Sequence, residues 1–265
     1  MTSQLESGSR REEAPVVIRE CTTVEEYDAC VLLQKVVFGH SDAENSPRRH
    51  FIVTKRAGGW TLGAFVEDEL VGFVHQMVAV RGREIIGYSH MMAVAAAYQN
   101  KGVGARLKWA QRERALAEGT SFITWTWDPM MARNAHFNIN RLGVTARSYG
   151  VNFYGTDYHA TGKGPGAGGG IASDRLFADW DLSSARVCAA AAAGHAPRLS
   201  AAPARTIEIP SDWRALLETD TETARREQLR VREEFQQSFA EGLVCAAFVR
   251  DAERPRYLLY HADEL

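Results

Sequence analysis

Six residues behind a strand-like segment have the composition of an anion-binding loop. The sequence QNKGVG occupies positions 99–104, where a predicted strand gives way to a predicted helix. Gly102 and Gly104 would let the backbone approach a ligand closely, and the amides and dipole of a helix N-terminus favour negative charge. Lys101 and Arg106 add positive charge nearby. The segment therefore predicts a site for phosphate groups.

Two other phosphate-binding patterns do not fit this loop. The dinucleotide fingerprint needs a third glycine three residues after Gly104, and the nucleotide P-loop needs a GxxxxGK sequence; both are missing. A glycine turn that only reverses the chain is the structural alternative at this point.

The loop resembles the pyrophosphate loop of GNAT acyltransferases, [RQ]-x-x-G-x-[GA], with the valine of the preceding strand present as Val94. Residues 70–74 look like the family's xVGF strand, and residues 123–129 followed by 135–144 resemble its later strand and its helix ending in LGF. The resemblance covers roughly residues 16–155.

This resemblance implies an α/β fold of the α+β type, with a mixed, mostly antiparallel splayed sheet flanked by helices. Acetyl-CoA or another acyl-CoA would bind as co-substrate, with pantetheine between the strand ending near Val94 and the strand 121–127. The main chain of Met92 and Val94 would pair with it, and Asn134 and Asn138 are candidate side-chain contacts. The implied cofactor-binding residues are Met92, Val94, Gln99, Asn100, Lys101, Gly102, Val103, Gly104, Ala105, Asn134 and Asn138.

The sequence departs from the family at the general acid. Many members place a tyrosine four residues before the glycine of LGF, but this chain has Ile139 there. Tyr149 and Tyr154 follow shortly and could protonate the departing thiolate, although an aromatic residue on a strand is more often part of the core. The thiolate could also leave with help from solvent.

An ammonium acceptor must lose a proton before it attacks a thioester, so a general base is required. His90 is the leading candidate because it precedes the loop on its strand and imidazole titrates near neutral pH. A core histidine is the simpler alternative. Asp128 is a candidate contact for the acceptor ammonium, or merely a cap for the next turn. His75 and Glu84 are further candidates.

The predicted elements of this part follow from local signals. Thr23 and Glu26 match a capping box, Gly39 is a helix stop, and alternating β-rich runs indicate three successive antiparallel strands. The resulting elements are an opening strand at 16–18, helices over 23–38, 43–55, 102–118 and 134–141, strands over 61–66, 70–80, 84–94 and 121–127, and a hairpin over 144–149 and 151–154. Trp125 and Trp127 either line the acyl or acceptor pocket or pack in the sheet.

The predicted domain organisation has four parts: a disordered tail (1–14), a catalytic domain (15–160), a glycine-rich linker (161–173) and a small C-terminal α/β extension (174–265). We expect this extension to contain a strand over 175–182, an alanine-rich low-complexity stretch over 184–205, a helix from 219–222 to 240, and a hairpin over 243–249 and 256–260. Because its strands cannot bury both faces alone, the extension should pack on or extend the main sheet.

Composition excludes several classes of protein. Thirty-one Lys and Arg residues nearly balance thirty-three Asp and Glu residues, which disfavours a nucleic-acid partner. The four cysteines form no metal-ligand spacing and no disulfide framework, so no metal is expected. No run of about 18 apolar residues predicts a membrane span, and the polar N-terminus is unlike a signal peptide, so we expect a cytoplasmic protein. A homodimer is the default assembly on symmetry grounds.

The sequence thus predicts an acyl-CoA-dependent N-acyltransferase. It would transfer acetyl, or a small acyl group such as succinyl, to the amine of a small molecule, with an amino acid as the leading acceptor. Arg141 or Arg147 would suit an acceptor carboxylate, but neither is singled out. The alternatives are a non-catalytic CoA-binding regulatory module, suggested by Ile139, and a protein N-acetyltransferase.

Overall fold

The computed structural model describes residues 14–39, 44–156 and 170–265. Most of the predicted tail and of the glycine-rich linker lies outside these ranges. The main sheet has six strands in the order β1-β2-β3-β4-β5-β9, and every neighbouring pair is antiparallel except β4 and β5. Its strands are β1 Val16–Glu20, β2 Trp60–Val66, β3 Glu69–Arg81, β4 Glu84–Val94, β5 Phe122–Thr124 and β9 Trp180–Asp181.

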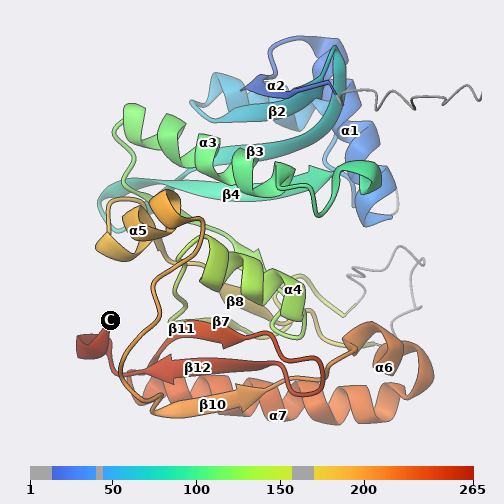
Figure 1. Cartoon of the computed structure of the whole chain (residues 1–265). Helices are drawn as coiled ribbons and strands as arrows, with labels where there is room; N and C mark the ends of the chain where they lie inside the picture. The colour runs from blue at the N-terminus through green and yellow to red at the C-terminus, as the bar shows by residue number, and fades with distance from the viewer. Residues whose placement is uncertain (1–13, 40–43, 157–169) are drawn as a thin grey trace, which may run out of the picture.

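Three helices cover the two faces of this sheet (Figure 1). Helices α1 (Val24–Phe38) and α2 (Arg48–Arg56) pack with Phe65 and Phe73 on one face. Helix α3 (Val103–Ala117) packs Leu107 on the other. The fold class is therefore confirmed: a mixed α/β fold with a mostly antiparallel sheet between helices.

The N-terminal elements follow their local signals closely. Thr23 closes a capping box on α1, and Gly39 ends the helix at φ +64°. The three successive antiparallel strands are also confirmed. Helix α2 begins at Arg48, later than predicted, because Pro47 disfavours helical geometry in the residue before it.

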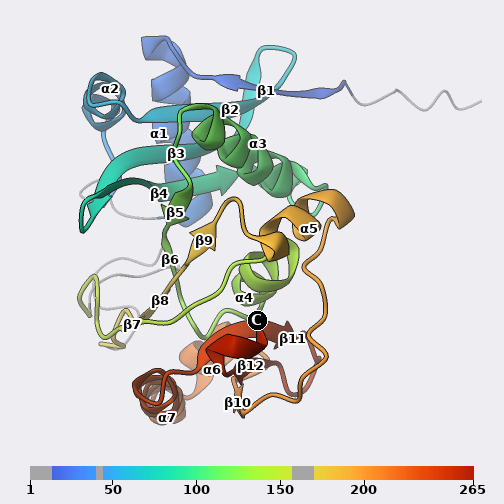
Figure 2. The ribbon, with the colours of Figure 1, turned by 90° about the vertical axis from the view of Figure 1, so that its left-hand side faces the viewer.

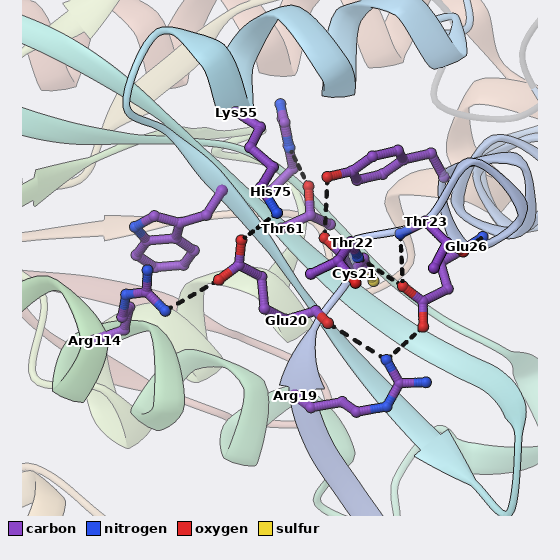
Figure 3. Close-up of polar contacts among 12 residues, drawn as sticks. Arg19, Glu20, Cys21, Thr22, Thr23, Glu26, Lys55, Thr61, His75 and Arg114 are labelled. Carbon is purple, nitrogen blue, oxygen red and sulfur yellow. Dashed lines mark hydrogen bonds and ion pairs between the residues drawn. The ribbon is translucent and has the colours of Figure 1, made fainter.

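The end of β1 ties the helices of both faces together (Figure 3). Glu20 pairs with Lys55 of α2 at 3.1 Å and with Arg114 of α3 at 3.2 Å. The neighbouring Arg19 pairs with Glu26 of α1. These partly exposed pairs contribute little free energy individually, but they fix where β1 enters the sheet.

Two strands predicted to be continuous are each broken in two. Beyond β5 the chain turns at Trp125 and forms β6 (Thr126–Trp127), which pairs with β8 (Arg175–Phe177) instead of the main sheet. The carbonyl oxygen of Trp125 accepts a bond from the amide of Ala178 at 2.7 Å, at the matching break between β8 and β9. The predicted strands 121–127 and 175–182 therefore bend together.

The hairpin predicted over 144–149 and 151–154 is wrong. Strand β7 (Tyr149–Gly150) pairs with β8, and residues 151–154 form a turn. Residues before β7 bridge two other parts of the chain: Thr145 pairs with Asp179, and Ala146 pairs with Cys245. Local alternation indicates strands but does not specify their partners.

The C-terminal part forms a second, three-stranded sheet backed by a long helix (Figures 1 and 2). The predicted helix and closing hairpin are confirmed, whereas β10 and α6 were not predicted. The alanine-rich stretch contains α5, because Ser184 caps it, alanine favours helix and Gly194 ends it at φ +75°. The elements are α5 Ala185–Ala193, β10 Arg205–Glu208, α6 Trp213–Thr219, α7 Thr221–Ala240, β11 Val244–Val249 and β12 Arg256–Tyr260.

Backbone and side-chain hydrogen bonds join this second sheet to the first part of the chain. The backbones of Ala146 and Cys245 exchange two bonds, at 3.0 and 2.9 Å. The side chain of Asn140 bonds both backbone polar groups of Phe248, at 2.7 and 3.1 Å. Tyr257 of β12 donates to the carbonyl oxygen of Pro129 at 2.7 Å. The two sheets are thus connected through the segment 129–146.

A chain of polar side chains is buried between α3 and the sheet. Lys108, 2% exposed, places its Nζ 2.9 Å from Ser89 Oγ and 2.9 Å from Gln111 Oε1. Gln111 continues the chain to Gln76 at 2.9 Å. The Lys108 nitrogen also lies 3.6 Å from the ring centroid of Trp125. Burial holds the pKa of Lys108 well below its usual value.

The burial of the Lys108 amino group predicts a stability that depends on pH. Between its lowered folded pKa and the value of about 10.4 in an unfolded chain, the unfolded state binds more protons, so stability rises with pH, by at most about 1.4 kcal/mol per pH unit. Urea unfolding from pH 7 to 10 should show this rise in the wild type and lose it in Lys108→Met. The surface variant Lys35→Met should keep it; equal slopes in all three proteins would contradict the assignment.

The hydrogen bonds of Tyr257 lead to a prediction of how much the contact between the C-terminal sheet and the turn after β6 stabilises the protein. Its hydroxyl donates to Pro129 O and accepts from Trp127 Nε1 at 3.3 Å, all within the core. Tyr257→Phe leaves these two buried groups without a partner, which should lower the free energy of unfolding by about 1–3 kcal/mol. Chemical denaturation measures this loss. Tyr98→Phe, at a half-buried tyrosine above the loop, should change stability by less than about 0.5 kcal/mol.

Candidate active site

The main sheet opens between β4 and β5. These parallel strands share only two register pairs, Gly87 with Ile123 and Tyr88 with Thr124. Beyond them β5 ends, and the chain leaves to pair β6 with β8. Residues 89–94 of β4 pair with β3 along one edge, and no strand of the described chain pairs with their other edge. The sheet is therefore splayed at this point, as the sequence predicts.

The main chain of Met92 and Val94 faces this open edge. The amide of Ala95 bonds to Val71 of β3 at 2.9 Å, and backbone groups alternate between the two edges of a strand. The carbonyl groups of Val94 and Met92 therefore point away from β3. The side-chain amide of Gln99 occupies one of these positions, donating to Val94 O at 2.9 Å.

The predicted anion loop lies at the end of the open edge. Asn100 and Gly102 adopt positive φ angles of +61° and +83°, and Gly102 begins α3 without a capping side chain from the described residues. The first amides of a helix have no intrahelical partner, so those after Gly102 are available to an anion. A Cβ atom at Gly102 would meet no described atom within 4 Å, and at Gly104 it would touch Met92 at 3.6 Å. The loop is thus open on the side to which a Cβ atom at Gly102 would point.

The other residues expected around the loop do not all point toward it. Arg106 turns away and donates to Val16 O at 2.7 Å, while Lys101 lies 5.7 Å from the ring of Tyr98. Arg133 reaches Gln99 Oε1 at 3.3 Å, which places the short helix α4 (Ala132–Ala135) across the splay from the loop. Asn134 is exposed on this helix.

The following helical segment lies deeper in the fold. Asn138 is buried at 5% exposure in the π-helix His136–Arg141, whereas Asn134, the other predicted asparagine, is exposed. Ile139, which stands where the family tyrosine would be, is fully buried in the same π-helix.

A β-bulge positions His90. Ser89 lies opposite Gln76 and Met91 opposite the adjacent His75, so His90 is an extra residue on β4. Since Ser89 contacts α3, the bulge turns His90 toward α1 and α2. Its ring lies 5.1 Å from the ring of His50 on α2, and its Nε2 is 3.3 Å from Ser46 Oγ.

His90 belongs to a cluster of three histidines whose environment keeps them neutral. The rings of His50 and His75 are 5.0 Å apart, and His75 Nδ1 lies 2.7 Å from Thr61 Oγ1 (Figure 3). Burial lowers the pKa of His75 to about 3. Desolvation, and secondly His50, lower the pKa of His90 to about 4, although its side chain keeps an exposed surface. The imidazole of His90 is therefore uncharged at neutral pH.

This cluster does not have the arrangement of a metal centre. No group of three His, Cys, Asp or Glu side chains among the described residues is placed to hold a metal ion. The Nε2 atoms of His50 and His75 are buried and have no hydrogen-bond partner in the described part of the chain.

The two candidate tyrosines differ in their surroundings. The hydroxyl of Tyr154 is 3.1 Å from Thr126 Oγ1 and hydrogen-bonds with Tyr88 at the last paired position of β4. Tyr149 donates to Asp174 Oδ2 at 2.8 Å, and burial followed by this carboxylate raises its pKa far above the usual range. Tyr154 thus lies beside the splay, and Tyr149 is held within a different network.

The remaining candidates have structural partners. Asp128 accepts from the amide of Met130 at 2.8 Å, and burial raises its pKa while Arg175 opposes the rise. Glu84 pairs with Arg81 at the far end of β4. Trp125 and Trp127 are buried in the core. Sequence reasoning missed His50, Tyr88 and Arg175; only Tyr88, two residues before His90 on one strand, could have been found by alternation.

The site geometry can be set beside known proteins. Residues 25–137 match the sequence profile of the acetyltransferase (GNAT) family. The NatC complex bound to Gag peptide and CoA has a TM-score of 0.50 at 13% identity, over 63% of this chain and 99% of that chain. The ribosomal-protein-S18-alanine N-acetyltransferase from Escherichia coli has a TM-score of 0.49 at 15% identity, over 64% and 96%. No curated protein matches the chain.

The likeness to the NatC complex supports the fold alone, because the sequence identity is only 13%. No helix of the described ranges is long and apolar enough to cross a membrane. The sequence match and the splayed sheet with its glycine-started helix agree with each other: residues 25–137 form an acetyltransferase domain of the GNAT family, whose members transfer acyl groups from acyl-CoA to amines.

Proposed function

We propose that this protein transfers an acyl group from acyl-CoA to the amine of a small molecule. The acyl group is acetyl or a small acyl such as succinyl, and the acceptor is an amino acid or a related amine. The observation that supports the proposal is the open edge of β4, which has the loop at one end and the bulged His90 at the other. Val94 lies four residue steps after His90 on the strand, about 13 Å, so one extended ligand would span both.

The donor thioester would lie along this edge. Its phosphates would meet the amides at the start of α3, and its pantetheine would pair with the main chain of Met92 and Val94. A main-chain amide at the edge could also polarise the thioester carbonyl, because donors aimed at a developing oxyanion lower the barrier to acyl transfer. The carbonyl oxygen of Val94 now accepts a hydrogen bond from the side chain of Gln99. This bond must break before the same oxygen can accept one from pantetheine.

The chemical step needs a neutral amine and two proton movements. The amine nitrogen attacks the thioester carbon, a C–N bond forms and the C–S bond breaks. His90 accepts the proton of the nitrogen, which becomes acidic as the bond forms; with a pKa of about 4 it suits this role better than removal of a proton from a free ammonium. Tyr154 gives its proton to the departing thiolate.

The loop assignment predicts that Gly102→Glu abolishes stabilisation by CoA. A carboxylate at the start of α3 would repel the phosphates and occupy the open side of the loop. Thermal unfolding with acetyl-CoA, succinyl-CoA and free CoA measures binding to the folded state. Gly119→Glu is the matched control, because Gly119 also has a positive φ, +80°, and open space, but lies beyond the other end of α3. A ligand-induced shift that survives in Gly102→Glu would refute the loop assignment.

The role of His90 predicts that His90→Gln lowers kcat by about 100-fold or more, while acetyl-CoA still stabilises the protein. The assay is thiol release from acetyl-CoA and succinyl-CoA with a panel of L- and D-amino acids and polyamines. The exposed His195 offers a control, since His195→Gln should keep wild-type activity. In the wild type, protonation of His90 should reduce kcat/KM only near pH 4 and not near pH 6.5.

Two results would contradict this proposal. Unchanged kcat in His90→Gln would remove His90 from the mechanism. Stabilisation by acyl-CoA without thiol release for any amine would instead favour a CoA-binding regulatory module.

A further inference from the structure

We infer that the acceptor carries a carboxylate beside its reacting amine, and that Arg175 binds this carboxylate. The inference rests on the proposed function and adds the acceptor class and the residue that selects it. The sequence pointed to Arg141 or Arg147 for such a role. Arg147 pairs with Asp179 at 3.2 Å, and Arg141 extends toward Gly194 after α5, so neither side chain is directed at the splay.

Strand register places Arg175 on the same sheet face as the reacting groups. Thr126 lies opposite Phe177, and one residue pair further Trp127 lies opposite Leu176. Continuing this antiparallel register brings Asp128 next to Arg175, on the face that Thr126 and Phe177 share. Gly150 is the neighbour of Arg175 on the other side.

This shared face is the one that His90 uses. Ser89 contacts Lys108 of α3, so the adjacent Tyr88 and the bulged His90 are turned to the opposite side. Tyr88 and Thr126 both meet the hydroxyl of Tyr154. The guanidinium carbon of Arg175 lies 5.1 Å from the centroid of the Tyr154 ring. Tyr88, Tyr154 and Arg175 thus meet beside the splay, and His90 leaves β4 toward the same side two residues after Tyr88.

Arg175 is buried, and two described carboxylates beside it, those of Asp174 and Asp128, differ in their contacts. Its side chain is 6% exposed, and its Nη1 donates to the backbone oxygen of Asp174 at 2.7 Å. The Asp174 carboxylate accepts from Nε and Nη2 of Arg232, at 2.8 and 3.0 Å, and from the hydroxyl of Tyr149. Asp128 is the carboxylate that neighbours Arg175 on the ladder and senses its charge.

A zwitterionic acceptor matches this pair of charges. A guanidinium offers a planar set of N–H donors that suits a carboxylate, and a desolvated environment strengthens the contact. Asp128 would attract the ammonium of the arriving acceptor, and His90 would receive the proton of the reacting nitrogen. An acceptor held by its carboxylate at Arg175 would present its α-amine to the thioester between β4 and β6.

The experiment compares amino acids with their primary amides as acceptors, in the thiol-release assay. For the wild type, kcat/KM should be at least tenfold higher for the acid than for the amide. Arg175→Met should lower kcat/KM for the acid about 100-fold, mainly through KM, and leave the amide unchanged. Arg175→Lys, which keeps the charge but not the planar donor set, should recover part of the loss.

Arg147→Met is the matched control, since it removes an arginine that is half exposed and paired with Asp179. It should leave the ratio of acid to amide unchanged. Stabilisation of Arg175→Met by acetyl-CoA would verify that the variant is folded. If this variant does not fold, the wild-type ratio and the KM of Arg175→Lys decide the question.

Equal kcat/KM for acid and amide in the wild type would overturn the inference while leaving the proposed acyl transfer intact. An equal loss for both acceptors in Arg175→Met would assign Arg175 to the scaffold. Absence of thiol release with every amine would instead refute the proposed function.

Discussion

The departure of β5 from β4 after Thr124 is the constraint on which the rest of the structure depends. A strand at the centre of a sheet normally forms hydrogen bonds with a neighbour on both edges, whereas residues 89–94 pair with β3 on one edge and with no strand of the described ranges on the other. The edge persists because the chain after Thr124 is bonded elsewhere, to β8 and Ala178. In the function that we propose, the pantetheine arm of the acyl-CoA takes the place of this strand. The loop before α3, the bulge at His90 and the hydroxyls of Tyr88 and Tyr154 all lie around this unpaired edge of β4.

The supports of the splay lie outside the matched domain. Strand β8 holds β6 away from β4, and Asp174 at its start is fixed by Arg232 of α7. Asn140 and Ala146 are bonded to β11, and Tyr257 of β12 fixes the turn after β6. The C-terminal part therefore contributes to the geometry of the site, because it determines where the second arm of the splayed sheet runs.

Features controlled by neighbouring residues could be predicted from the sequence. Thr23 and Gly39 delimit α1, short connections imply the antiparallel strands, and the glycines mark the loop at the start of α3. The break at Trp125 could not be predicted, because it depends on a bond to Ala178 far along the chain. The hairpin over 144–154 failed for the same reason, since β7 pairs with β8.

The candidate site follows the same division. The loop and the location of His90 on its strand were readable, but the bulge that turns His90 toward His50 has no local signal. Arg175 joins the area only through the β6–β8 register, so its role could not be inferred from spacing. Tyr149 and Tyr154 are similar in sequence context, and only their partners, Asp174 and Thr126, distinguish them.

The bonds between Asn140 and Phe248 have a consequence for synthesis of the protein. The two residues are 108 positions apart, so at roughly 5–20 residues per second a ribosome needs on the order of 5–20 s between them. During this interval the segment around Ala146 has an uncovered strand edge, which is a template for association with other chains. The nascent chain therefore exposes this edge from the synthesis of residue 146 until β11 has emerged.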